Sequence, residues 1–74
     1  MQPYTDQLQR ALIMIEAYAE NADRFAAHAL TQADAAEGVA RRLWLAECEK
    51  ERAKAAAFRT AHETISKELG SEGA

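Results

Sequence analysis

The chain has 74 residues, of which 49% are apolar and 28% charged, and its formal net charge is −3 at pH 7. This length fits one small domain. A single proline, three glycines and the charged fraction exclude collagen-like, disordered and membrane-embedded classes. Half of the apolar share is alanine, because 18 alanines stand against 18 larger apolar residues. Helices built from such a chain can approach one another closely.

No segment reads as a membrane span or a targeting signal. The longest run of large apolar residues is 12–15, far short of a bilayer span, and no signal-peptide pattern opens the chain. Cys48 is the single cysteine and cannot form an internal disulfide, so a reducing, cytoplasmic setting is expected. Residues 1–37 carry two basic and six acidic groups, whereas residues 38–74 carry seven and six. Two antiparallel halves with this imbalance would attract each other weakly.

Strong helix formers dominate from Tyr4 to Leu69 and predict two long helices. The first is expected over about residues 4–30, because apolar residues repeat there at the 4-3 spacing of a coiled-coil seam. Tyr18 and Phe25 lie beside this seam and widen the apolar face. The seam consists of Leu8, Leu12, Ile15, Ala19, Ala22, Ala26 and Ala29.

A turn is expected at about residues 31–34, where Thr31 and Asp34 resemble the capping residues of a new helix. An extra break at residues 21–23, which would give three helices, is the alternative. The second helix is then expected over about residues 35–69, which makes residues 1–69 a single helical domain. Gly70 suits the left-handed residue that ends a helix, so residues 70–74 are expected to form a flexible tail.

The second helix carries a 4-3 seam of its own, with Glu51 and His62 as polar members. Two seams enclose no central core, and Ile13, Met14 and Leu45 would remain exposed to water. The expected fold is therefore an all-α antiparallel hairpin that dimerises with a second copy into a four-helix bundle. The second seam consists of Trp44, Cys48, Glu51, Ala55, Phe58, His62, Ile65 and Leu69.

Patterns of catalytic and metal-binding residues are missing from the sequence. Neither histidine belongs to a Glu-x-x-His or His-x-x-x-His pair, although Glu16 and Glu20 could approach His62 and Glu63 across the hairpin. The glycines match no phosphate-binding loop, and no serine lies in a nucleophile elbow. We therefore expect no enzymatic activity, no cofactor and no metal, and we expect Cys48 to be a buried packing residue.

Trp44 is flanked by Leu43 and Leu45, and three adjacent residues span about 200° of a helix surface. One neighbouring helix cannot cover them all, and a tryptophan in such a position is typical of an interface. These three residues, with Ile13 and Met14, are the candidate partner-binding residues. The predicted function is a small protein–protein interaction module: an adaptor, chaperone or inhibitor of a larger protein. Fold-level analogy places phage-encoded proteins in the same class.

The alternative function is a small dimeric DNA-binding regulator that uses the basic residues of 41–59. Three glutamates lie among these basic residues and would repel phosphate from the same helix surface, so nucleic-acid binding is the less favoured function. The basic residues concerned are Arg41, Arg42, Lys50, Arg52, Lys54 and Arg59.

Overall fold

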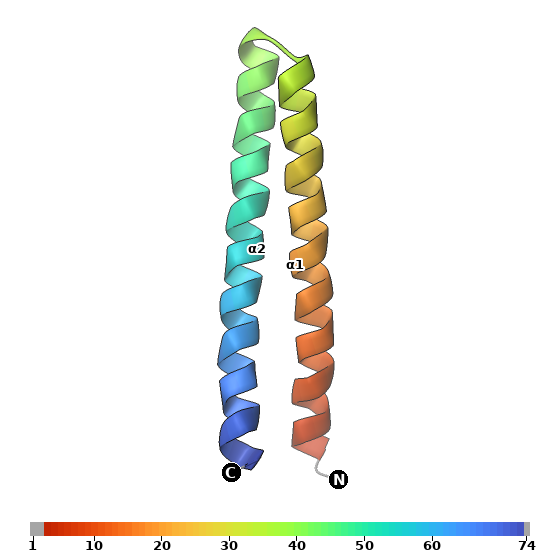
Figure 1. Ribbon diagram of the computed structural model, residues 1–74, viewed down its shortest axis with the longest axis vertical. Coiled ribbons are helices and arrows are strands. Elements are labelled where there is room, and N and C mark those ends of the chain that lie inside the picture. The colour runs from red at the N-terminus through yellow and green to blue at the C-terminus, as the bar shows by residue number, and fades with distance from the viewer. Residues whose placement is uncertain (1–2, 74) are drawn as a thin grey trace.

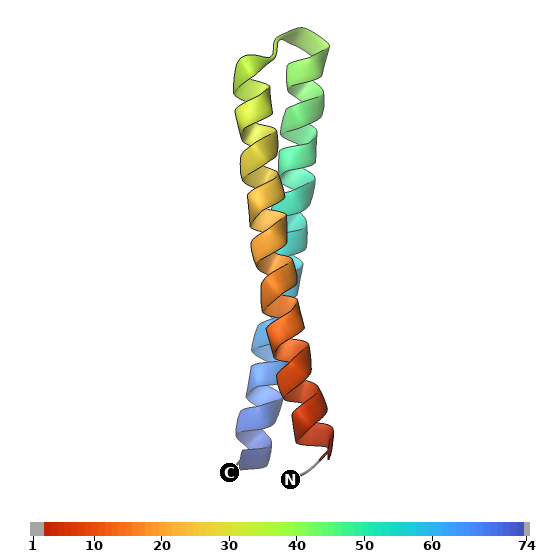
Figure 2. The ribbon, with the colours of Figure 1, turned by 90° about the vertical axis from the view of Figure 1, so that its right-hand side faces the viewer.

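The computed structural model describes the backbone of residues 3–73 and the side chains of residues 4–70, and it consists of two antiparallel helices (Figure 1). Helix α1 spans Pro3–Ala35 and helix α2 spans Gly38–Gly73. They form a rod of 55 × 15 × 11 Å, with the start of α1 and the end of α2 at the same end of the rod. Seen from the side, the helices cross at a shallow angle (Figure 2), as two helices joined by a 4-3 seam do. The predicted all-α hairpin is confirmed.

The predicted seams form the contact between the helices. The apolar residues buried there are small, whereas the larger seam residues, such as Leu12 and Phe58, are half-buried. Small side chains let the two backbones approach closely. Cys48 is buried against Ala26 and Ala29, next to Trp44, which confirms that it is a packing residue. The buried apolar residues are Ala19, Ala22, Ala26, Ala29, Ala33, Cys48 and Ala55.

The turn lies later in the chain than predicted. Helix α1 continues through residues 31–34 and ends at Ala35, and it has no break at residues 21–23. The Thr31 hydroxyl donates to the Ala27 carbonyl one turn earlier (3.1 Å) and does not cap a new helix. The physical reason is burial: Ala33 continues the 4-3 spacing and is completely buried in the seam (0% exposed), which stabilises the helix at this point.

Two residues, 36 and 37, connect the helices. The Ala36 N–H donates to the Ala33 carbonyl (3.2 Å), and the Glu37 carbonyl accepts from the Arg41 N–H as α2 begins (3.5 Å). Gly38 has a φ of +60°, a backbone conformation that residues with a side chain rarely adopt. Gly38 therefore allows the chain to reverse over so short a connection.

Helix α2 also runs beyond its predicted end at residue 69. Its backbone is helical through Gly73, and Gly70 lies inside the helix without a positive φ, so the prediction of a left-handed cap there is wrong. A glycine inside a helix costs only about 1 kcal/mol relative to alanine, which is not enough to end a long helix. Of the predicted flexible tail, 70–74, the side chains of residues 71–74 lie outside the described part. Over the residues that are described, neither helix has a stretch long and apolar enough to cross a membrane.

Candidate interaction surface

The two helices meet along the seam and leave two broad faces, which differ in chemistry. In a helix, residues 18 and 25 lie on one flank of the α1 seam, and residues 16 and 23 lie on the other. The first flank therefore carries aromatic rings next to α2, and the second carries acidic groups. Side chains of α2 contribute to both faces: Trp44 and Phe58 lie with the aromatic rings of α1, and Arg59 lies with its acidic groups.

Four aromatic side chains form one face, which we call the aromatic groove: Tyr18 and Phe25 from α1, and Trp44 and Phe58 from α2. The ring centroids of Tyr18 and Phe58 lie 5.5 Å apart. Trp44 meets the edge of the His28 ring at a centroid distance of 5.9 Å and an interplanar angle of 87°. Phe25 has no such ring contact among the described residues and is 62% exposed.

Three shallow hollows run end to end along the aromatic groove. Trp44 and Glu47 line both of the hollows nearer the turn. Phe25 and Glu51 line both the middle hollow and the hollow farther from the turn. Tyr18 also lines the latter. Phe25 therefore lies near the middle of this row of hollows, which aromatic and charged side chains line together.

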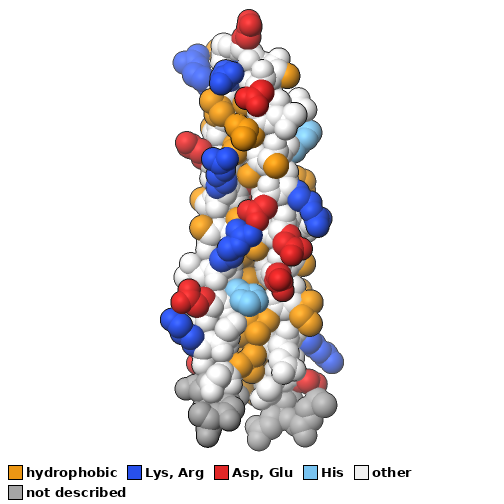
Figure 3. Space-filling model, viewed as in Figure 1, with side chains coloured by type: hydrophobic (Ala, Val, Ile, Leu, Met, Phe, Trp, Pro, Cys, Tyr) orange, Lys and Arg blue, Asp and Glu red, His pale blue; other side chains and the backbone are white. Residues whose placement is uncertain are grey.

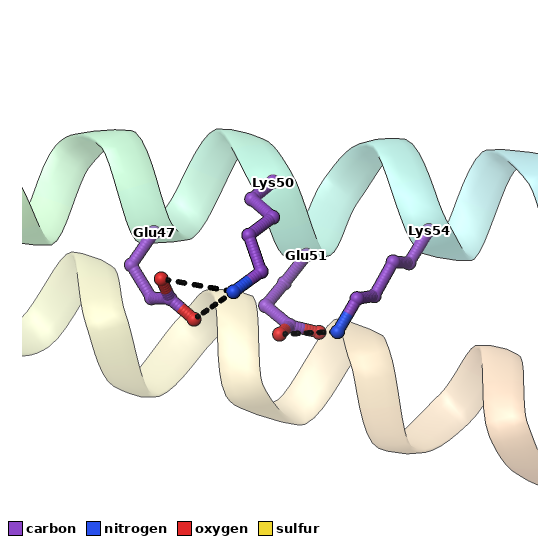
Figure 4. A network of polar contacts seen from close by, with 4 residues as sticks. All are labelled: Glu47, Lys50, Glu51 and Lys54. Atoms are coloured by element: carbon purple, nitrogen blue, oxygen red, sulfur yellow. Dashed lines mark hydrogen bonds and ion pairs between the residues drawn. The ribbon is translucent and has the colours of Figure 1, made fainter.

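A charged row on α2 borders this groove: Glu47, Lys50, Glu51 and Lys54 (Figure 4). Lys50 Nζ lies 3.3 Å from Glu47 Oε1, and Lys54 Nζ lies 3.2 Å from Glu51 Oε1. Glu51 occupies a seam position and is only 7% exposed, so its lysine partner compensates for the loss of water around the carboxylate. The row alternates acid, base, acid, base along the helix.

The opposite face is polar. The Arg59 guanidinium donates to both carboxylate oxygens of Asp23, the only described ion pair that joins α1 to α2. This hydrogen bond from Arg59 holds the pKa of Asp23 below its usual value, and the same contact raises the pKa of Arg59. Figure 3 shows a face of the hairpin on which acidic and basic side chains are mixed along both helices, with apolar atoms between them.

Glu16, Glu20, His62 and Glu63 do come together, as the sequence suggested, around one hollow of the polar face. The Ser66 hydroxyl lies 3.5 Å from His62 Nδ1, one turn along the same helix. Within the described part of the chain, no three histidine, cysteine, aspartate or glutamate side chains are grouped so that they could hold a metal ion.

The predicted partner-binding residues do not form one patch. Leu43 and Leu45 are exposed on different sides of α2 near the turn, and Trp44 between them is half-buried against α1. Ile13 and Met14 are exposed on α1, more than twenty residues before its end at Ala35, and so lie well away from the turn.

Phe25 and Tyr18 were predicted only to widen the seam, yet both are exposed at the groove. The signal in the sequence was their seven-residue spacing, which keeps both rings at the same offset from the seam.

The basic residues of 41–59 are spread over the hairpin. Lys50 and Lys54 belong to the charged row, and Arg59 lies on the polar face with Asp23. Arg41, Arg42 and Arg52 make no ion pair with the described residues, and their positions span about 100° of the α2 circumference. The fold therefore does not bring all six onto one face.

The chain has no detectable similarity that would assign it to a family. No protein-family model, no curated protein and no solved structure matches it.

Proposed function

We propose that this chain is a small, non-catalytic protein–protein interaction module that acts as a homodimer. Two hairpins pack through their aromatic grooves into an antiparallel four-helix bundle, and the outer helix faces bind a larger protein. The observation that carries the proposal is the mismatch between what the hairpin buries and what it exposes. Its buried apolar residues are six alanines and a cysteine, whereas Phe25 and Leu43 are more than 60% exposed.

The surface area supports a second copy. The hairpin exposes 5487 Å², whereas a compact monomer of its mass would expose about 4,500 Å². The excess of roughly 1,000 Å² is comparable with the ~800 Å² per partner that a stable protein interface buries. Covering the aromatic groove with a second copy would give the domain a core of large side chains, which it lacks as a single hairpin.

A dimer formed in this way leaves other apolar residues for a larger partner. Ile13 is 70% exposed and lies on the side of α1 away from the seam, and Leu45 lies towards the polar face. Both lie outside the groove and would stay accessible in the bundle. An adaptor, chaperone or inhibitor needs such a second surface in addition to the one that holds the dimer together.

Sedimentation equilibrium at micromolar concentration tests the dimer, with Phe25→Ser compared against Ile13→Ser. The two residues are similarly exposed on the same helix but lie on different sides of it. The wild type and Ile13→Ser are expected at twice the 8.2 kDa chain mass, and Phe25→Ser is expected to dissociate. A wild type that is monomeric at these concentrations overturns the proposal, and so does equal dissociation of both variants.

The DNA-binding alternative is tested by titrating duplex DNA at two salt concentrations. We expect no tight binding, because the basic residues are dispersed and three of them are paired with acids. Tight, salt-sensitive binding that an Arg41→Ala/Arg42→Ala variant loses would replace the interaction module with a DNA-binding regulator.

A further inference from the structure

We infer that the second copy binds with its α2 antiparallel to α2 of the first, so that the two charged rows pair with each other. This inference rests on the proposed homodimer and specifies its geometry. It makes the interface isologous: the same residues contact one another in both directions across a two-fold axis.

The order of charges carries the inference. Along α2 the row is negative at Glu47, positive at Lys50, negative at Glu51 and positive at Lys54. A two-fold axis that passes between residues 50 and 51 places Glu47 opposite Lys54 of the second copy, and Lys50 opposite its Glu51. The exposed charges of Glu47, Lys50 and Lys54 then each lie opposite an oppositely charged residue of the second copy, in addition to their partners within the row, and Glu51 takes part from its largely buried seam position. The row is therefore complementary to itself.

The other two-fold stacking of the same faces, with the axis along the rod, would place α2 over α1 of the second copy. The α1 side chains that line the groove are Tyr18, Asn21, Phe25 and His28, and they include no carboxylate, lysine or arginine. Glu47 and Lys50 would then lose water while keeping only each other as ionic partners, because the second copy would offer them no opposite charge. The charges therefore favour the stacking in which α2 packs against α2 of the second copy.

The aromatic groove fits this axis. Phe25 and Glu51 line the same two hollows, so Phe25 is level with the centre of the charged row. Phe25 consequently meets Phe25 of the second copy near the two-fold axis, where two rings can pack against each other. The same rotation brings the part of α1 around exposed Met14 next to the turn end of the other hairpin, with exposed Val39 and Leu43. Apolar residues that are far apart in one hairpin become neighbours in the dimer.

Two charge variants test the pairing. Lys50→Glu/Lys54→Glu makes the row entirely acidic, and Glu47→Lys/Glu51→Lys makes it entirely basic. Each variant alone is expected to dimerise about tenfold or more weakly than wild type, and an equimolar mixture is expected to recover dimers. Arg42→Glu/Arg52→Glu is the matched control, because it changes the net charge of α2 equally outside the row, and it should dimerise like wild type.

Sedimentation equilibrium and circular dichroism of each variant, alone and mixed, give the readout. A wild type that stays monomeric removes the proposed dimer itself. A wild-type dimer whose charge variants dimerise equally well, and do not prefer each other, leaves the dimer standing but overturns the α2-on-α2 geometry.

A second measurement leaves the charged row intact, in case the charge variants lose helicity. A spin label is attached at Glu37→Cys in a Cys48→Ala background, and the distance between the two labels of the dimer is measured. Antiparallel stacking places the two turns on opposite sides of the axis, and position 37 lies 13.5 residues from it along the helix, so at 1.5 Å per residue the two labels should be about 40 Å apart along the rod. A short separation, with both turns at the same end, would overturn the inference.

Discussion

The alanine seam predicts that a single larger side chain on it will force the helices apart. Ala26 is 4% exposed and packs with Ala29 and Cys48, next to Trp44. Ala26→Leu adds three carbon atoms at this point. If there were room, burying them would gain about 2.4 kcal/mol, at about 0.8 kcal/mol for each carbon. The neighbours are already in contact, so we expect a net loss of about 1–3 kcal/mol in the free energy of unfolding.

The neighbouring residue provides the control. Ala27 is exposed on the same helix turn, so Ala27→Leu has the same helix propensity and none of the crowding. Its effect on the free energy of unfolding should stay within about 0.5 kcal/mol.

Thermal unfolding by circular dichroism, with all proteins at one concentration, measures the difference between the two variants. A loss of ~2 kcal/mol corresponds to a fall in Tm of roughly 8–16 °C for a chain of this size. If the Tm of Ala26→Leu equals or exceeds the Tm of Ala27→Leu, the seam has space for a larger residue. Close contact between the helices would then not explain the alanine content.

Two further predictions concern the turn and the ion pair between the helices. Gly38→Ala should lower the free energy of unfolding by about 1 kcal/mol, because residue 38 has a positive φ, even though the added methyl group has open space around it. Gly70→Ala is the control: it lies inside α2 with equally open space, and it should leave the free energy of unfolding unchanged or raise it in the same thermal melts. The lowered pKa of Asp23 means that its pairing with Arg59 stabilises the folded chain above the ordinary aspartate pKa, and that this stabilisation is lost as the pH falls through the folded-state value. Asp23→Asn should therefore melt below wild type at pH 7 and together with it in strong acid; a gap that persists in acid would mean that the charge of Asp23 is not responsible.

The local pattern of the sequence determined the helices and their buried sides. Helix-forming residues and a 4-3 spacing act over a few turns, so burial at positions such as Ala19 and Ala55 follows from the sequence alone. The same holds for Cys48, whose place in the seam indicated its burial. The spacing also makes Glu51 a polar member of the seam, and the structure adds its ion pair with Lys54.

Only the tertiary structure decided where the chain turns and therefore which residues face each other. Near Thr31 a capping signal competes with the continuing seam, and the burial of Ala33 against α2 settles the competition in favour of helix. Moving the turn by four residues shifts every pairing between the helices by about eight residues, or two helical turns. Contacts such as Asp23 with Arg59, and the gathering of four aromatic rings on one face, depend on that register, which no local pattern of residues contains.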